Sequence, residues 1–146
     1  MKALYIRDGR APIPKSELTS KIMSKIRAKN TRPELLLRKT LWKAGLIGYR
    51  LHWKYAPGRP DICFTKRKLA VFVHGCFWHR CPYCQPSLPK SHVSFWRNKF
   101  QRNKARDIAK LRLLRNAGWK ALVFWECQIN RNPTKIVRKI SEHLAR

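Results

Sequence analysis

The chain has 146 residues, of which 34 are lysine or arginine and 7 are aspartate or glutamate, so its formal net charge is +27. A hydrophobic fraction of 44% excludes a disordered basic tail, and no apolar run approaches the roughly 18 residues of a membrane span. A chain of this length buries one core and attracts polyanions. We therefore expect a nucleic-acid-binding protein, either an enzyme or a ribosomal or chromatin-type protein.

The N-terminal segment differs in composition from the rest of the chain. Residues 1–17 contain Pro12 and Pro14 and few apolar side chains, which predicts a flexible basic arm before one domain at 18–146. The first ten residues lack the long apolar stretch of a secretory signal, so we expect a cytoplasmic, nucleoid-associated protein. A short helix is predicted at 20–28.

The first well-delimited helix is predicted to follow this segment. Thr31 and Glu34 form a capping-box pattern, and Pro33 suits the first helical turn. The helix is predicted to end at Gly45. Because a capping box needs an acid where Glu34 stands, its position alone does not indicate a catalytic role.

Three β-like stretches come next. The segment 49–53 alternates polar and apolar residues, whereas 61–64 and 69–74 are short and apolar. A basic turn joins the last two, as in the buried strands of a meander.

Helical and β patterns alternate in the second half of the chain. After a loop at 75–92, a long basic helix is predicted at about 94–117, followed by a strand at 119–126. A last helix carries four apolar residues on one face, namely Ile136, Val137, Ile140 and Leu144. The order of elements predicts an α/β fold in which helices flank a mixed β-sheet.

Four of the five cysteines fit a metal site, and they are Cys76, Cys81, Cys84 and Cys127. Four thiolates close a tetrahedral shell around Zn²⁺ and leave no open position, so such a site would be structural. The alternative is that these cysteines are unpaired buried thiols. Cys81 and Cys84 form a C-x-x-C pair, but a redox role is not indicated, because no thioredoxin-like βαβ unit surrounds the pair. Cys63 lies inside a predicted strand and is interpreted as a core residue.

Acidic side chains are informative in so basic a chain, because they repel a phosphate ligand. Asp61 follows a proline at the start of a buried strand, where a carboxylate can hold Mg²⁺ for phosphodiester cleavage, although Pro-Asp also occurs in turns. Asp107 lies on the apolar stripe of the long helix, between Phe100 and Leu111. An inward carboxylate needs a partner, which indicates either a structural ion pair or an active site.

The segment HGCFWH at 74–79 combines two histidines with two large aromatic residues. His74 and His79 suit proton transfer near neutral pH, unless one of them is a zinc ligand. Phe77 and Trp78 either pack in the core or form a rigid wedge that enters the DNA base stack. The remaining histidines are interpreted as ordinary surface or strand residues, and they are His52, His92 and His143.

Several motifs occur together and in a fixed order. They are SKIMSKI at 20–26, T-x-x-E at 31–34, PGRPD at 57–61, FVHGCFWH at 72–79, FW followed by N-x-x-R-D at 103–107, and GWKALVFWEC at 118–127. Over about residues 18–130 they resemble the very short patch repair (Vsr) DNA mismatch endonucleases. The pairing of HGCFWH with WEC is highly specific.

This resemblance implies a restriction-endonuclease-like fold and Mg²⁺-dependent nicking of one strand of double-stranded DNA beside a T·G mismatch, by a monomer. It further implies that Asp61 and the backbone carbonyl of Val73 hold Mg²⁺ and that His79 activates water. The other residues that it places in the active site are His74, Asp107 and Glu34.

By the same resemblance, Phe77 and Trp78 intercalate next to the mismatch, and Met23 enters from the other groove. Better-known members of the family have a histidine among the zinc ligands, whereas this chain has Cys81 and Cys84, which still complete a four-thiolate shell. A longer and more basic N-terminal arm is a second departure. Two alternatives stay open: a non-catalytic zinc-binding nucleic-acid protein, and a related nuclease with a defence or restriction target.

Overall fold

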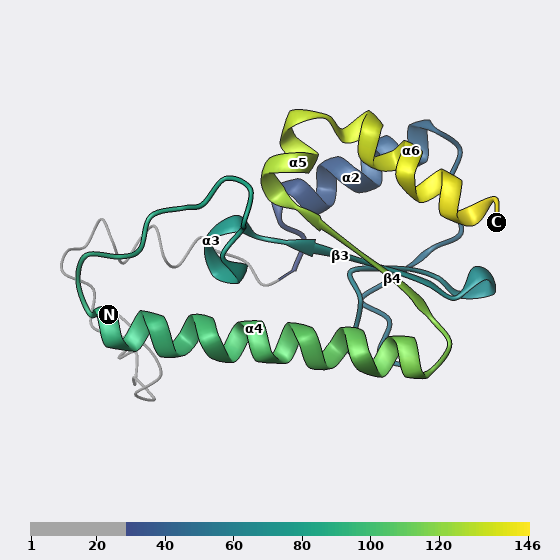
Figure 1. Cartoon of the computed structure of the whole chain (residues 1–146). Coiled ribbons are helices and arrows are strands. Elements are labelled where there is room, and N and C mark those ends of the chain that lie inside the picture. The colour runs from purple at the N-terminus through teal and green to yellow at the C-terminus, as the bar shows by residue number, and fades with distance from the viewer. Residues whose placement is uncertain (1–28) are drawn as a thin grey trace, which may run out of the picture.

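The described part of the chain, residues 29–146 of a computed structural model, is a mixed α/β fold around one four-stranded sheet (Figure 1). The elements are α2 (Arg32–Lys43), β1 (Arg50–Leu51), β2 (Ile62–Phe64), the 3-10 turn η1 (Thr65–Arg67), β3 (Leu69–His74), α3 (Cys76–His79), α4 (Val93–Asn116), β4 (Lys120–Trp125), α5 (Glu126–Arg131) and α6 (Pro133–Leu144). The predicted α/β class is confirmed. The arm at 1–17, the helix at 20–28 and Met23 lie outside the described residues.

The sheet has the strand order β1-β2-β3-β4. The first three strands are antiparallel neighbours, so the predicted meander is confirmed. β4 pairs with β3 in parallel, with Val73 opposite Phe124 and His74 opposite Trp125. A parallel pair needs a crossover connection, and α4 is the long helix within it.

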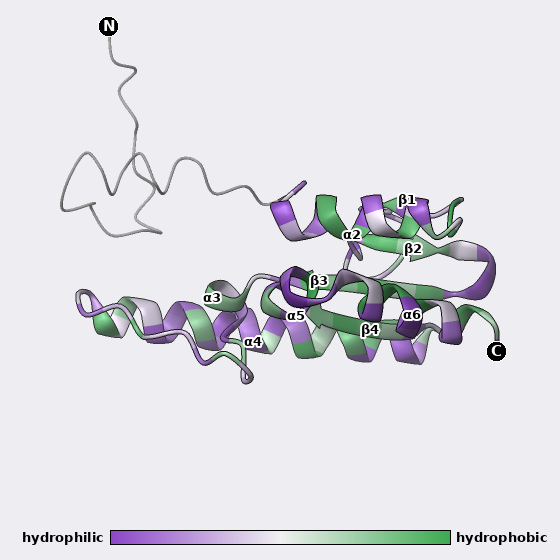
Figure 2. Ribbon diagram, turned by 90° about the horizontal axis from the view of Figure 1, so that it is seen from above, coloured by the Kyte–Doolittle hydropathy of each residue, from purple (hydrophilic) through white to green (hydrophobic). Residues whose placement is uncertain are grey.

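The period of two along the strands separates two cores, one on each face of the sheet. Val71 and Val73 belong to the larger core, which packs against α2, α5 and α6. Ala70 and Phe72 belong to the smaller core, which packs against α4. Figure 1 shows β3 and β4 between α4 on one side and α2, α5 and α6 on the other, and Figure 2 shows both strands in the green of hydrophobic residues. His74 continues the even-numbered series of β3, and its side chain therefore lies on the α4 face.

Most predicted element bounds agree with the structure within one or two residues, but two helices are additional. The predicted loop at 75–92 contains α3, a single turn that is too short to show a helical period in the sequence. α5 precedes α6, which begins after Asn132; the side chain of Asn132 accepts a hydrogen bond from the N–H of Lys135. The predicted apolar face of the last helix is buried in α6.

β1 is shorter than predicted from the alternation at 49–53. The strand ends after Leu51 because His52 has a left-handed backbone, with φ of 47°. The N–H of His52 still donates to the carbonyl of Asp61, over 3.2 Å. The side chain of His52 therefore leaves the strand alternation at the point where the chain passes Asp61.

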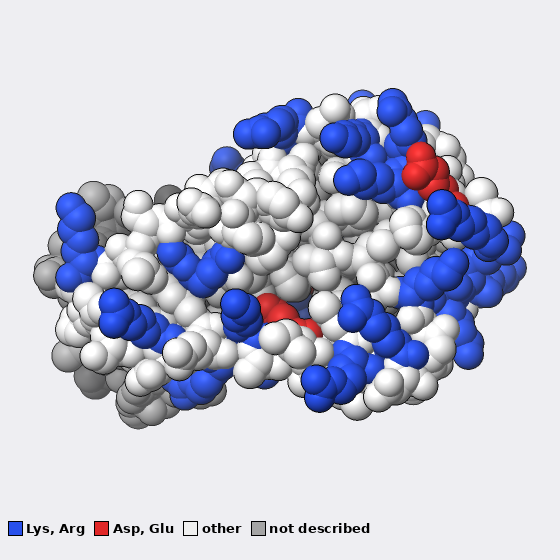
Figure 3. All heavy atoms as spheres, viewed as in Figure 1, with Lys and Arg blue, Asp and Glu red and all other residues white. Residues whose placement is uncertain are grey.

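Basic side chains cover much of the surface. Figure 3 shows lysine and arginine spread over one face of the molecule, with few acidic groups among them. Such a field suits a polyanion that contacts a broad area rather than one pocket. None of the helices in residues 29–146 has the length and apolar character needed to cross a membrane.

Candidate active site and cysteine metal centre

The centre of the candidate site is the carboxylate of Asp61, just before β2. Its Oδ2 accepts a hydrogen bond from the N–H of Val73, over 2.7 Å. Burial raises the pKa of Asp61 to about 6; the bond from Val73 opposes this effect and the neighbouring charge of Glu34 adds to it. Burial disfavours the ionised carboxylate of Asp61, so a cation bound next to it would stabilise the ionised form.

Val73 also orients a backbone carbonyl in this region. The N–H and C=O groups of one strand residue point to the same side of the strand. Because the Val73 N–H is directed to Asp61, its carbonyl faces the same side of β3. The position is thus consistent with two oxygen donors next to each other, one from a side chain and one from the main chain.

A second group of side chains adjoins the first on the α4 face. Asp107 Oδ2 lies 2.6 Å from Nδ1 of His79, and the rings of His74 and His79 are stacked with centroids 4.0 Å apart. Burial alone would raise the pKa of Asp107, but the hydrogen bond and the charge of His79 bring it below its ordinary value. Ionised Asp107 is only an acceptor, so Nδ1 of His79 donates and its Nε2 is left as the basic nitrogen.

His74 is buried, with 7% of its surface exposed. Burial lowers the pKa of His74 to about 4, and the neighbouring charge of His79 adds to the effect. His74 is therefore a neutral imidazole near pH 7. The structure thus brings together four of the residues singled out in the sequence, namely Asp61, His74, His79 and Asp107.

The pKa values of Asp61 and His74 affect stability with opposite signs. Between pH 4 and 6.5 the unfolded chain protonates His74 and the folded chain does not, so this residue makes stability rise with pH. Between pH 3.8 and about 6 the folded chain keeps the proton of Asp61 and the unfolded chain does not, so stability falls with pH. Each effect is about 3 kcal/mol, and they nearly cancel in the wild type.

We therefore expect Asp61→Asn to uncover the effect of His74. The free energy of unfolding of this variant should rise by about 3 kcal/mol from pH 4 to 6.5, relative to the wild type. Thermal unfolding at several pH values measures the difference. Protonation of the cysteines at low pH also affects stability, but it affects both proteins equally, so it drops out of the comparison with the wild type. His74→Asn should show the opposite slope. Parallel curves for all three proteins would contradict the two assignments.

Glu34 is the fifth predicted residue, and it is only 3% exposed. Its N–H donates to Thr31 Oγ1, as a helix cap requires. Its carboxylate accepts from the N–H of Asn30 and from Arg38, and faces His52 at 3.5 Å. The capping interpretation explains the N–H but not the burial of the carboxylate beside a histidine.

The interpretation of His52 as an ordinary surface or strand residue is wrong. Its Nδ1 lies 3.6 Å from Asp61 Oδ1 and its Nε2 faces Glu34, so the ring stands between two site carboxylates. Burial lowers the pKa of His52, and the charge of Glu34 only partly offsets this. The positive φ at this residue redirects the ring, and nothing in the local pattern of residues 49–53 indicates it.

Lys110 is a second residue that sequence analysis did not select. It lies one turn after Asp107 on α4, and a Cβ added to Gly58 would come within 2.8 Å of Lys110 Cβ. The Gly58 turn therefore packs directly on α4 and needs glycine for its positive φ and for this approach. Burial raises the pKa of Asp61, and the charge of Lys110 opposes this effect. The spacing of three from Asp107 was the available signal.

The cysteine cluster lies beside this site, at the ends of β3 and β4. The sulfurs of Cys76, Cys81, Cys84 and Cys127 lie within 4.8 Å of one another. Sγ of Cys81 and Sγ of Cys127 are 3.7 Å apart, close to the ~3.8 Å edge of a tetrahedron with Zn–S bonds of about 2.3 Å. The four cysteines could therefore hold one metal ion, as predicted. Glu126, the first residue of α5, accepts from the N–H of Cys76 and so ties α3 to α5.

Phe77 and Trp78 lie on α3 and pack against α4, half-buried. Phe77 contacts Trp96 and Phe100 edge to face, at 5.6 and 5.4 Å between ring centroids. Lys99 lies over the ring of Trp78, at 5.2 Å. The side-chain amide of Asn103 donates to the carbonyl of Trp78, which holds α3 against α4. Core packing thus accounts for part of both side chains, and each keeps a partly exposed surface among cations.

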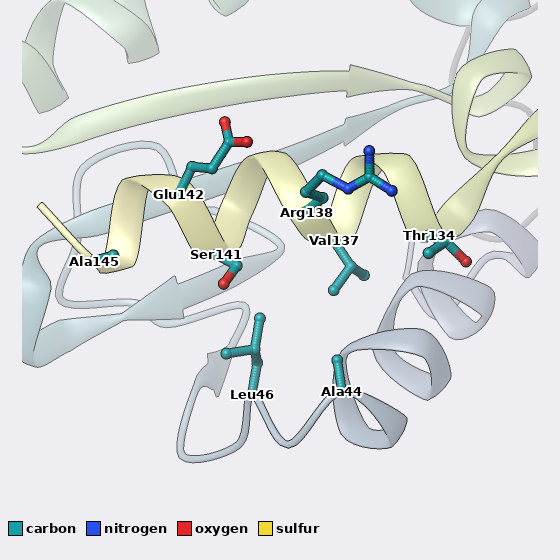
Figure 4. A pocket seen from close by; sticks show the side chains of 8 residues that line it. All are labelled: Ala44, Leu46, Thr134, Val137, Arg138, Ser141, Glu142 and Ala145. Carbon is teal, nitrogen blue, oxygen red and sulfur yellow. The ribbon is translucent and has the colours of Figure 1, made fainter.

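One hollow in the structure is separate from this chemistry. It lies between the end of α2 and α6, and Figure 4 shows the side chains that line it, including Leu46, Val137, Arg138 and Glu142. None of the residues of the two clusters described above lines it. The residues of the candidate site lie instead around β2, β3 and α4.

A buried carboxylate, a His–Asp pair and a strongly basic surface are the features that a hydrolase acting on nucleic acid needs. The model of the family described as DNA mismatch endonuclease Vsr matches residues 13–85. The chain is 44% identical to the type II nicking enzyme V.XorIIP of Xanthomonas oryzae, over 75% of this chain and 79% of the relative.

It is 38% identical to the type II nicking enzyme V.NmeAIP of Neisseria meningitidis, over 83% of this chain and 90% of the relative. It is 34% identical to the DNA mismatch endonuclease Vsr of Escherichia coli, over 75% of this chain and 70% of the relative. The chain belongs to the Vsr family and is a DNA endonuclease. The alternative of a non-catalytic nucleic-acid-binding protein is thereby set aside.

Proposed function

We propose that the protein nicks one strand of double-stranded DNA beside a T·G mismatch, in a Mg²⁺-dependent reaction of very short patch repair. It acts as a monomer in the cytoplasm, bound to the nucleoid. Its domain at 18–146 has the restriction-endonuclease-like fold, and the basic arm at 1–17 precedes it. The observation that carries the proposal is the convergence of Asp61, His79 and Asp107 at one end of the inner strands β2 and β3, within a family of DNA endonucleases.

The donor set fits Mg²⁺, which prefers oxygen ligands. The carboxylate of Asp61 and the main-chain carbonyl of Val73 would hold the ion, with water and phosphate oxygens as further ligands. When bound, such an ion lowers the pKa of a coordinated water and offsets the charge that develops on the phosphate. Asp61 is held against the main chain of β3 by the bond from the Val73 N–H, which makes it the preferred ligand.

The His79–Asp107 pair would move the proton of the attacking water. Asp107 accepts from Nδ1, so the imidazole presents its Nε2 lone pair to the reaction. His74 lies flat against His79 and restricts its rotation. Glu34 would act as a further acid of the site, through His52, whose ring lies between Glu34 and Asp61.

Mismatch recognition would come from the exposed surfaces of Phe77 and Trp78, with Met23 entering from the opposite groove. A T·G pair stacks less well than a matched pair, so a wedge between base pairs costs least there. The cysteine centre on one side of α3 and Asn103 on the other keep the wedge rigid. Recognition by deformability needs few contacts to base edges.

Trp78→Ala is expected to reduce nicking at T·G by at least about tenfold, because stacking on a base contributes roughly 1–3 kcal/mol. Binding to matched duplex should change little, since it depends on phosphate contacts. Single-turnover nicking and binding titrations on the two duplexes measure both effects. The control is Trp119→Ala, which removes a ring from the α4-side core, 6.1 Å from Trp53. It should lower the melting temperature and leave the preference for T·G unchanged.

A panel of duplexes tests the target. Each duplex carries one T·G, A·C or matched pair at the same position, and the cut is located on each strand. The proposal requires fast nicking of one strand only at T·G. Equal cutting of matched DNA would favour the alternative of a restriction or defence nuclease. Several relatives are named type II nicking enzymes, which is the reason to test this alternative.

A further inference from the structure

Glu34, His52 and Asp61 come from three separate parts of the chain and converge on one point. Glu34 lies in the first turn of α2, His52 directly after β1 and Asp61 directly before β2. One ligand atom from each of them lies within 4.8 Å of the other two. The side chain of His52 is 16% exposed and that of Glu34 is 4% exposed, so water competes little for the space between them.

The ring nitrogens of His52 make no good hydrogen bond with the two carboxylates beside them. Its nitrogens lie 3.5 Å from Glu34 Oε2 and 3.6 Å from Asp61 Oδ1, which is too long for good hydrogen bonds. Nε2 is buried without a hydrogen-bond partner among the described residues. A neutral imidazole has one N–H, so it can donate to only one of two carboxylates, and its other nitrogen presents a lone pair to an acid.

We propose that Glu34, His52 and Asp61 form one cation site, in which the imidazole ligand makes a first-row transition ion such as Mn²⁺ bind more tightly than Mg²⁺. The inference deepens the proposed function, because Asp61 is the metal ligand there as well. A cation among the three groups satisfies both carboxylates and the lone pair of His52 at once. Arg38 pairs with Oε2 of Glu34, whereas no lysine or arginine within residues 29–146 pairs with Asp61.

The choice of ion follows from the mixed ligands. Mg²⁺ takes oxygen ligands almost exclusively, whereas Mn²⁺ accepts carboxylate oxygen and imidazole nitrogen together. The left-handed backbone of His52 is also explained, because it turns the ring out of the β1 alternation and toward the two acids. A strand residue with an ordinary φ would present its ring to one face of the sheet.

The test measures Mn²⁺ binding to the zinc-loaded full chain without DNA, by electron paramagnetic resonance. Pulsed spectra detect the nitrogen of a directly bound imidazole, which a merely structural role of His52 would not produce. The variant is His52→Asn, because asparagine tolerates a left-handed backbone. His92→Asn is the matched control: the same substitution at an exposed histidine with φ of 55°. Melting temperatures check folding, and His52→Gln serves as a second variant.

We expect a nitrogen coupling in the wild type and in His92→Asn, and its loss in both His52 variants. The affinity for Mn²⁺ should fall at least tenfold in those variants, while the weaker affinity for Mg²⁺ changes less than twofold. Absence of the coupling in the wild type overturns the inference, even if the variants do not fold. An unchanged coupling and affinity in folded His52→Asn also overturn it.

Nicking by the same wild-type preparation separates this inference from the proposed function. If the coupling is absent and T·G duplex is nicked with Mg²⁺, only the ligand role of His52 fails. If the coupling is present and depends on His52, the cation site is supported. This holds even if the protein nicks no duplex with either ion, an outcome that would contradict only the proposed function.

Discussion

Asp61→Asn is expected to reduce the rate of DNA nicking by at least about 10³-fold, equivalent to about 4 kcal/mol of transition-state stabilisation. The substitution removes one negative charge from the proposed metal site and keeps an oxygen that can accept the Val73 N–H. The fold and the basic surface therefore persist. DNA affinity should remain within about twofold, because it depends on many phosphate contacts in a chain with net charge +27.

Single-turnover nicking of a T·G duplex and a binding titration on the same preparation check this result. Glu142→Gln is the matched control, since it removes one exposed carboxylate on α6. Glu142 lines the hollow of Figure 4, which contains none of the residues of the candidate site. It should nick at the wild-type rate. An Asp61→Asn protein that nicks within tenfold of the wild type would contradict the assignment of the metal ligand.

We propose that the four-cysteine cluster holds one structural zinc, so Cys127→Ser is expected to abolish either the folded state or the binding of zinc. A structural zinc contributes on the order of 10 kcal/mol to small domains, which is comparable to the whole free energy of unfolding. The backbone N–H of residue 127, which donates to Sγ of Cys76, persists in serine, so the variant removes only the Cys127 thiolate. Metal analysis and thermal unfolding of the purified variant measure the effect.

The matched control is Cys63→Ala, which changes a buried cysteine outside the cluster. It should retain one zinc per chain and lose only about 1–2 kcal/mol of stability through reduced packing. A Cys127→Ser protein with the zinc content and melting temperature of the wild type would contradict a four-cysteine structural site. Removal of zinc from the wild type by a strong chelator should reproduce the loss seen in Cys127→Ser.

Elements with strong periodicity were predictable from the sequence. β2 and β3 are buried and apolar, and α4 has a stripe that places Phe100 inside. The same stripe correctly predicted that Asp107 faces inward. Its partner could not be derived from a local pattern, because His79 lies 28 residues away and reaches Asp107 only when α3 packs on α4.

The shorter features escaped prediction for physical reasons. α3 is one turn, and its position depends on the cysteine cluster and on Asn103 rather than on helical propensity. β1 ends early because of the backbone conformation of His52, which tertiary contacts with Asp61 set. The burial of Glu34 was hidden by a valid capping motif, since one residue serves both the helix end and the site.

The central claim is that this site cuts one DNA strand at a T·G pair. A supercoiled plasmid with a single T·G mismatch and its fully matched counterpart test it most directly, each with Mg²⁺ and with EDTA. We predict that the mismatched plasmid becomes an open circle with Mg²⁺ only, with one cut next to the mismatched thymine, while the matched plasmid stays supercoiled. Linear product, equal cutting of both plasmids or cutting in EDTA would contradict the claim.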